Sequence, residues 1–200
     1  VNKYYNQDSS KPNTIYITQA SLLDDLFHFD NTFFKISKME ADNIQPKSLQ
    51  ILEVSYLACL DAGYDKKAMY DTQTDVFIGC WECGNDNKED NAYAAVSHTL
   101  STVSGRISFH LGLKGATASI DTACSSSLYA IDACVKSLRN NKCDMALAGA
   151  VNTVINVEDI FVVCRANMLS PDCKCFTFDE KANGYVKCEA VGALLLKKTS

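Results

Sequence analysis

The chain has little proline and glycine, with only 3 Pro and 9 Gly among 200 residues. It also lacks internal repeats and low-complexity tracts, so no flexible linker divides it. Apolar residues make up 47% of the sequence, which is ample for a hydrophobic core. We therefore expect one domain, or one part of a larger domain.

Excess positive charge is also lacking, because the formal net charge is −5. This balance argues against a nucleic-acid partner and gives no support for binding to an anionic membrane. No apolar run approaches the length of a transmembrane helix, and the start of the chain has no signal-peptide pattern. The ten cysteines are scattered through the predicted core elements, which is typical of free thiols in a reducing compartment. We expect a cytoplasmic protein.

Short apolar segments alternate with helical patterns over most of the chain. The apolar segments predict strands over 75–80, 116–120, 145–150 and 191–196. Apolar periodicity predicts helices over 49–62, ending at Gly63, and over 92–104, ending at Gly105. The first twenty residues show no clear period and are expected to form a surface loop. This alternation predicts an α/β fold with a parallel or mixed sheet.

Cys124 occupies the most informative position in the sequence. It follows the predicted strand over 116–120 and precedes a helical pattern with apolar residues at Leu128, Ile131 and Leu138. A thiol at the start of a helix faces unpaired backbone N–H groups and the positive end of the helix dipole, and both favour the thiolate. The pattern therefore suits a catalytic nucleophile, but a buried structural cysteine would fit it as well.

The string DTACSSS, residues 121–127, resembles the active-site motif of the β-ketoacyl synthases, the condensing enzymes of fatty-acid and polyketide assembly. The likeness is strongest to ketosynthase domains of modular polyketide synthases and animal-type fatty acid synthases. Further segments resemble family motifs in the family's order: FDNTFFKIS (29–37), IQPKSLQILE (44–53), SGRISF (104–109), CDMALAGAVN (143–152) and MLSPD (168–172).

The resemblance implies a thiolase-like fold, of which residues 1–200 would be a partial N-terminal half. The family's layered α/β half contains a five-stranded mixed sheet, and we expect its first strand and the whole C-terminal half to lie outside this chain. In relatives the C-terminal half supplies two catalytic histidines, in HGTGT and NxGH segments that do not occur here. The three histidines present, His28, His98 and His110, stand in other contexts and are expected to be packing or surface residues.

The implied activity is a decarboxylative Claisen condensation. Cys124 would accept an acyl group, and its backbone N–H would supply one donor of the oxyanion hole. The domain itself would bind no cofactor, because acyl and malonyl groups arrive on the phosphopantetheine of an acyl carrier protein. Expected partners are that carrier protein, adjoining synthase domains including an acyltransferase, and a second copy that pairs through the strand over 116–120. The resemblance also places Phe161 and Met168 along the acyl pocket, although both would equally suit an ordinary core.

Two alternatives stay open at this point. The chain could belong to a thiolase-fold enzyme that acts on coenzyme A thioesters, or it could be an inactive fragment with a structural role. Four of the thiols of Cys80, Cys83, Cys173, Cys175 and Cys188 could in principle hold zinc. No metal is expected, because Cys80, Cys173 and Cys188 stand where relatives carry small residues or glycine. Lys187, Cys188 and Ala190 depart from the glycine-rich family pattern, which leaves the shape of that loop open.

Overall fold

The computed structural model describes residues 3–81, 93–97 and 99–199, which form two compact units. The first unit contains residues up to Asp24 together with 153–189, and the second contains the remaining described residues. The helices and strands of the second unit are, in chain order, α1 (Lys38–Asn43), α2 (Pro46–Asp61), α3 (Lys66–Met69), β1 (Thr74–Gly79), α4 (Ala94–Ser97), α5 (Leu100–Leu111), β2 (Thr117–Ile120), the 3-10 turn η1 (Ala123–Ser125), α6 (Ser126–Arg139), β3 (Met145–Asn152) and β4 (Ala190–Lys197).

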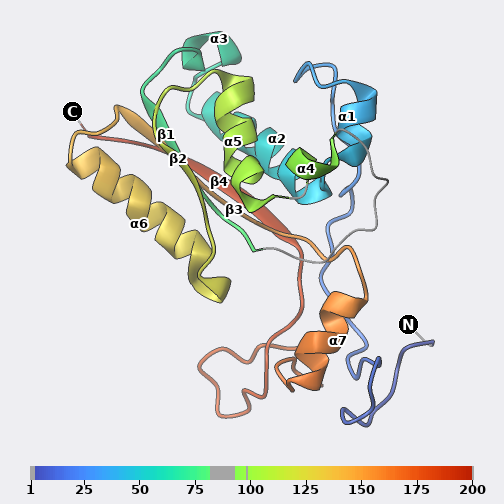
Figure 1. Ribbon diagram of the computed structural model, residues 1–200. Helices are drawn as coiled ribbons and strands as arrows, with labels where there is room; N and C mark the ends of the chain where they lie inside the picture. Colours follow the sequence, from blue (N-terminus) through green and yellow to red (C-terminus); the bar gives the residue numbers. More distant parts are fainter. Residues whose placement is uncertain (1–2, 82–92, 98, 200) are drawn as a thin grey trace. The chain divides into compact units, whose positions relative to one another are not determined.

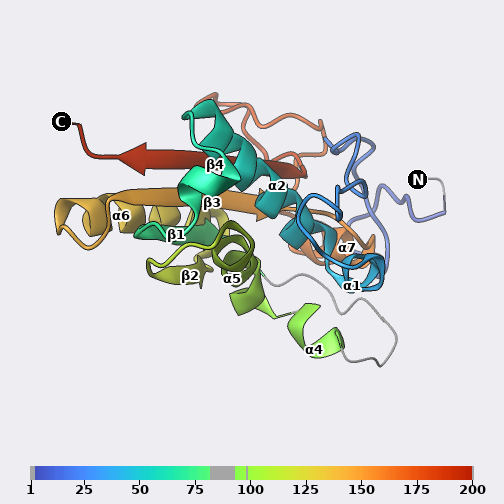
Figure 2. The same cartoon turned by 90° about the horizontal axis from the view of Figure 1, so that it is seen from above.

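A mixed sheet organises the second unit, with the strands in the order β2-β1-β3-β4 (Figures 1 and 2). β1 pairs in parallel with both β2 and β3, whereas β4 runs antiparallel to β3. The α/β class and the four strands read from the sequence are thus confirmed. The described residues form four strands, where the resemblance implied a family sheet of five with its first strand outside this chain.

Helices cover both faces of this sheet, as the alternation of side chains along the strands requires. Val76 and Ile78 of β1 and Leu147 of β3 pack in the core formed with α2 and α5. Phe77 of β1, together with Ala146 and Ala148 of β3, faces the opposite way and packs with α6. In Figure 1 the α6 helix accordingly lies on one side of the sheet, with α2 and α5 on the other.

The α6 helix uses a different face from the one that its large apolar residues suggested. Its buried positions are Ser126, Ala130, Cys134 and Leu138, spaced four residues apart, whereas Leu128 is 69% exposed. Small side chains on this stripe let the helix approach the strands closely. Leu128, which contributed to the apolar pattern in the sequence, therefore lies outside the packed face.

The helix predicted over 92–104 is also corrected. α4 ends at Ser97, and α5 begins at Leu100 and continues through Gly105. Its true end is Gly112, which adopts a left-handed φ of 69° as the C-cap. Gly105 has open space around its α-carbon, so the helix passes through it without strain.

The first unit contains the helix α7 (Glu158–Arg165) and long connecting segments. Ile15 and Ile17 pack against Val163, Cys164 and Leu169 in a separate small core. The expected loop over the first twenty residues is confirmed, apart from isolated bridges at single residues. Within the described ranges of both units, no helix is long and apolar enough to cross a membrane.

Candidate active site

Cys124 lies on an exposed turn between an edge strand and a helix. β2 ends at Ile120, the 3-10 turn η1 carries Cys124, and α6 begins at Ser126. The predicted strand-to-helix geometry is confirmed. The Cys124 side chain is accessible to solvent, so the alternative of a buried structural cysteine is wrong for this residue.

Short hydrogen bonds from neighbouring side chains hold this turn. The Ser126 hydroxyl accepts a bond from the Thr122 N–H at 2.8 Å and donates one to the Ala123 carbonyl at 2.7 Å. Asp121 accepts the Ala123 N–H at 3.0 Å through its carboxylate. Ala123 has a φ of 55°, a left-handed conformation that costs a non-glycine residue free energy and needs such support.

The backbone N–H of Cys124 is available to a ligand. In this turn the Ser125 N–H is bonded to the Thr122 carbonyl at 3.4 Å and the Ser126 N–H to the Ala123 carbonyl. Within the described residues, the hydrogen bonds of the turn leave the Cys124 N–H without an acceptor. An unpaired donor beside a nucleophile is suited to stabilise an oxyanion formed at that nucleophile.

The end of β1 packs tightly under the turn. Gly79 is paired with Ile120 across the parallel strands, so both lie at the carboxyl edge of the sheet. A Cβ on Gly79 would lie 2.6 Å from the carbonyl carbon of Ser126 and 2.8 Å from the Ser127 nitrogen. Only glycine lets the start of α6 come this close. The carboxyl edge of parallel strands is also the usual place for ligand sites in α/β folds.

The other thiols of the second unit have a different environment. Cys59, Cys80, Cys134 and Cys143 are all buried. Burial raises the pKa of Cys59 to about 11 and that of Cys134 to about 12, because the charged thiolate is poorly solvated there. Cys124 is the exposed thiol among the described cysteines of this unit.

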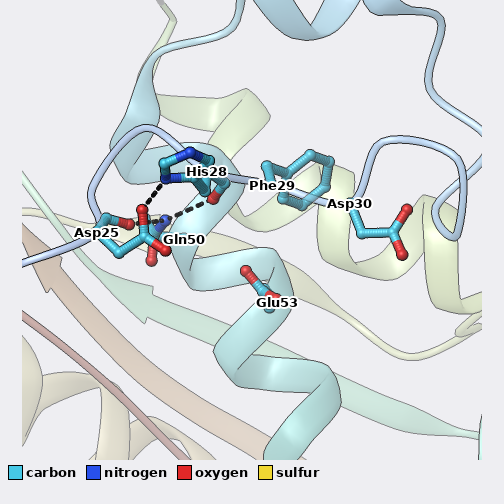
Figure 3. Close-up of a pocket in the computed structure, with 6 residues that line it drawn as sticks. All are labelled: Asp25, His28, Phe29, Asp30, Gln50 and Glu53. Carbon is cyan, nitrogen blue, oxygen red and sulfur yellow. Dashed lines mark hydrogen bonds and ion pairs between the residues drawn. The ribbon is translucent and has the colours of Figure 1, made fainter.

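His28 lies in a separate surface hollow formed by the loop before α1 and the helix α2 (Figure 3). Its Nδ1 contacts the Asp25 carboxylate, and Gln50 holds the loop by donating to the backbone carbonyls of Asp25, Leu26 and His28. Burial, together with the nearby carboxylates of Asp30 and Asp25, raises the pKa of Glu53. The residues that line the hollow are Asp25, His28, Phe29, Asp30, Gln50 and Glu53.

The remaining histidines give no sign of a catalytic base. His110 is half-buried in the last turn of α5, and His98 lies outside the described residues. In the described part of the chain, neither His28 nor His110 is hydrogen-bonded to Cys124. Cys83, and with it the C-x-x-C pair, also lies outside the described residues, and no group of three or more potential metal ligands occurs among those described.

Phe161 and Met168, the residues expected along an acyl pocket, both lie in the first unit. Phe161 belongs to α7, and its ring centroid lies 5.5 Å from that of Tyr4 in the small core. Met168 follows the helix and is 44% exposed. Their role in an acyl pocket stays a prediction.

A cysteine presented on a strand-to-helix turn, at the carboxyl edge of a layered α/β sheet, is the arrangement expected of a domain of the thiolase-like class. Comparison with known families agrees with this class, since the sequence model of the β-ketoacyl synthase N-terminal domain matches residues 1–200. The chain belongs to the β-ketoacyl synthase family.

Individual relatives are polyketide synthases and their ketosynthase domains. The chain is 37% identical over 200 residues to polyketide synthase PksL of Bacillus subtilis, covering 99% of this chain and 4% of that protein. It superimposes with a TM-score of 0.87 and 35% identity on the ketosynthase from module 6 of the bacillaene synthase of the same species, covering 98% of this chain and 33% of that one. An oxazolomycin ketosynthase domain from Streptomyces albus gives a TM-score of 0.87 at 29% identity, covering 98% and 36%. The chain thus spans about a third of each solved ketosynthase.

Proposed function

We propose that this chain supplies the acyl-accepting cysteine of a ketosynthase that extends a polyketide chain by decarboxylative condensation. The observation that carries the proposal is Cys124, an exposed thiol on a turn whose sequence resembles the family's active-site motif. The relatives named above support polyketide rather than fatty-acid assembly. A location in the cytoplasm stays a prediction.

In the first half of the proposed reaction, the Cys124 thiolate attacks the carbonyl carbon of an acyl thioester on a carrier protein. The negative charge moves to the carbonyl oxygen, where the Cys124 N–H can donate a hydrogen bond. Collapse of this tetrahedral intermediate expels the phosphopantetheine thiolate and leaves the acyl group on Cys124. Splitting the condensation in this way is the general advantage of covalent catalysis.

In the second half, a malonyl thioester loses carbon dioxide and becomes an enolate. The enolate carbon attacks the acyl carbonyl, the Cys124 thiolate leaves, and a β-ketoacyl thioester is released on the carrier protein. The resemblance assigns malonyl binding and enolate stabilisation to histidines in two segments that do not occur in residues 1–200. In our proposal these groups come from a second half-domain, and no cofactor is bound by this one.

We also propose that two copies pair through β2. This strand lies at one edge of the sheet, which supports the proposal because an edge strand offers unpaired N–H and C=O groups to another strand. Sedimentation of the full-length synthase should give a dimer. A substitution of Thr117 to Pro should shift it toward monomer, because the register Val76↔Thr117 turns the Thr117 N–H away from β1 and proline removes this donor from the free edge. A dimer unchanged by this substitution would contradict pairing through β2.

The condensation itself is tested with the full-length synthase, acyl-carrier protein and carboxyl-labelled malonyl-carrier protein. We expect a β-ketoacyl product and matching release of labelled carbon dioxide, both lost in Cys124→Ala. Product formation that survives this substitution would contradict the proposal. Reaction with acyl-coenzyme A but not with acyl-carrier protein would favour the alternative thiolase-type activity.

A further inference from the structure

Three cysteines lie in the connecting segments of the first unit, whereas Cys124 belongs to the second unit. Cys173 is half-buried, and Cys175 and Cys188 are exposed. The Val186 N–H donates to the Cys175 sulfur at 3.5 Å, which ties the segment of Cys175 to the segment that leads to Cys188. None of these thiols has a part in the proposed condensation.

Cys173 has an environment unlike that of the buried cysteines. Its sulfur lies 3.7 Å from the Thr18 hydroxyl. Burial raises the pKa of Cys173, but the Thr18 N–H, the Thr18 hydroxyl and the Gln19 N–H outweigh it, so the pKa is lowered overall. A lowered pKa favours the thiolate of this half-buried sulfur, which is the form that reacts with oxidants.

Cys173 and Cys175 are separated by a single residue, so the chain between them is short enough for a disulfide. Two residues of fully extended chain span at most about 7 Å, so the two Cα atoms cannot be further apart than this. Disulfides join Cα atoms about 4.4–6.8 Å apart. The backbone of Cys173 is also turned, with a φ of 54° and its N–H bonded to the Ser170 carbonyl at 3.0 Å.

We propose that Cys173 is a peroxide-sensitive thiol that forms an intramolecular disulfide with Cys175. In the first step the Cys173 thiolate attacks one oxygen of hydrogen peroxide, giving sulfenic acid and hydroxide. In the second, the Cys175 thiolate attacks the sulfenic sulfur and releases hydroxide, which leaves as water after protonation. The two thiols are oxidised by two electrons in total, and one peroxide is reduced to two waters.

Trypsin provides a direct test, because Lys174 separates the two cysteines. Digestion under non-reducing conditions yields the peptides 166–174 and 175–181, with Cys188 in a third peptide, 188–197. After peroxide treatment of the full-length protein, we expect the first two peptides to be joined by a disulfide that dithiothreitol cleaves. Cys188→Ser is the matched control and should leave this product unchanged.

Two further variants separate the steps. Cys175→Ser should leave sulfenic acid on Cys173 that dimedone traps, and Cys173→Ser should give neither product. Thr18→Val should slow the oxidation of Cys173 about fivefold, as the loss of one hydrogen bond to the thiolate implies. The proposal is overturned if Cys173 is not oxidised before the buried thiols, or if it is joined to Cys188 in place of Cys175.

Discussion

Gly79 and Ser126 touch backbone to backbone, where the end of β1 meets the first residue of α6. A Cβ at Gly79 would lie 2.6 Å from the Ser126 carbonyl carbon, closer than real side chains approach. The position of the Cys124 turn is therefore fixed by the glycine at the end of β1.

 The contact leaves no room for a group larger than hydrogen, so any side chain here must push the start of α6, and Cys124 with it, away from the sheet.

Substitution of Gly79 to Ala adds only a methyl group, but it should lower both the stability of the protein and the reactivity of Cys124. We expect a loss of about 1–3 kcal/mol in the free energy of unfolding, as overpacking typically costs, and slower alkylation of Cys124 by iodoacetamide. The matched control is Gly105→Ala, because nothing lies within 4 Å of the Cβ that it adds. That change sits inside α5 and should stabilise the protein by roughly 0.5–1 kcal/mol. Equal effects of the two substitutions would contradict the packing argument.

Ser126 should control the reactivity of Cys124 without touching the substrate. Ser126→Ala removes the acceptor of the Thr122 N–H and the donor to the Ala123 carbonyl, so the left-handed turn loses its support. We expect a destabilisation of about 1–3 kcal/mol and a slower reaction of Cys124 with both iodoacetamide and acyl thioesters.

Ser127→Ala is the control for this prediction, since it changes the neighbouring position of the same helix turn. It should leave the alkylation rate within about twofold of the unchanged protein. If Ser126→Ala also leaves the rate unchanged, the hydroxyl does not hold the turn.

The ion pair between Arg106 and Glu40 should contribute far more to the free energy of unfolding than the exposed ion pairs do. The Arg106 Nη1 lies 2.8 Å from the Glu40 Oε1, and the two side chains are only 10% and 27% exposed. Glu40→Ala leaves the arginine buried without its anion and should cost about 3 kcal/mol in urea unfolding. Lys38→Ala breaks the exposed pair with Asp42 and should cost less than about 0.5 kcal/mol. Similar costs for the two variants would show that burial is not what makes the inner pair important.

His110 should make the protein less stable in mild acid. Burial lowers the pKa of His110, and the Arg106 and Lys66 cations lower it further, while Glu40 opposes the change. As the pH falls through the ordinary histidine range, the unfolded chain takes up the proton first, so the free energy of unfolding decreases. The decrease ends once the folded imidazole is protonated as well. Urea unfolding between about pH 7.5 and 5.5 should show a shallower pH dependence in His110→Gln. An unchanged slope would contradict this.

The sequence predicted the strands better than the helices. β1 and β3 are short apolar runs of the kind that is buried in a parallel sheet, so their positions could be read directly. The extent and the packed face of a helix depend on the elements that it contacts. α5 continues through Gly105, which has open space around it. α6 packs through small residues such as Ala130 and Cys134, in a core that includes Ala146 and Ala148 of β3. Neither fact is visible in the periodicity of one segment.

Only part of the candidate site could likewise be predicted from the sequence. Cys124 could be found from its motif and from the change of pattern around it. The contributions of Gly79 and Ser126 could not, because one depends on a contact between segments far apart in sequence and the other on the direction of a single hydroxyl.

The most direct test of the account is to locate the acyl group after loading. The full-length synthase is incubated with acyl-carrier protein without malonyl thioester, digested with trypsin and sequenced by mass spectrometry. Peptide 115–136 contains both Cys124 and the buried Cys134, so fragmentation compares an exposed and a buried thiol within one molecule. We predict the acyl group on Cys124, with loading abolished in Cys124→Ala and retained in Cys134→Ala. An acyl group on another residue, or loading that persists in Cys124→Ala, would contradict the central claim.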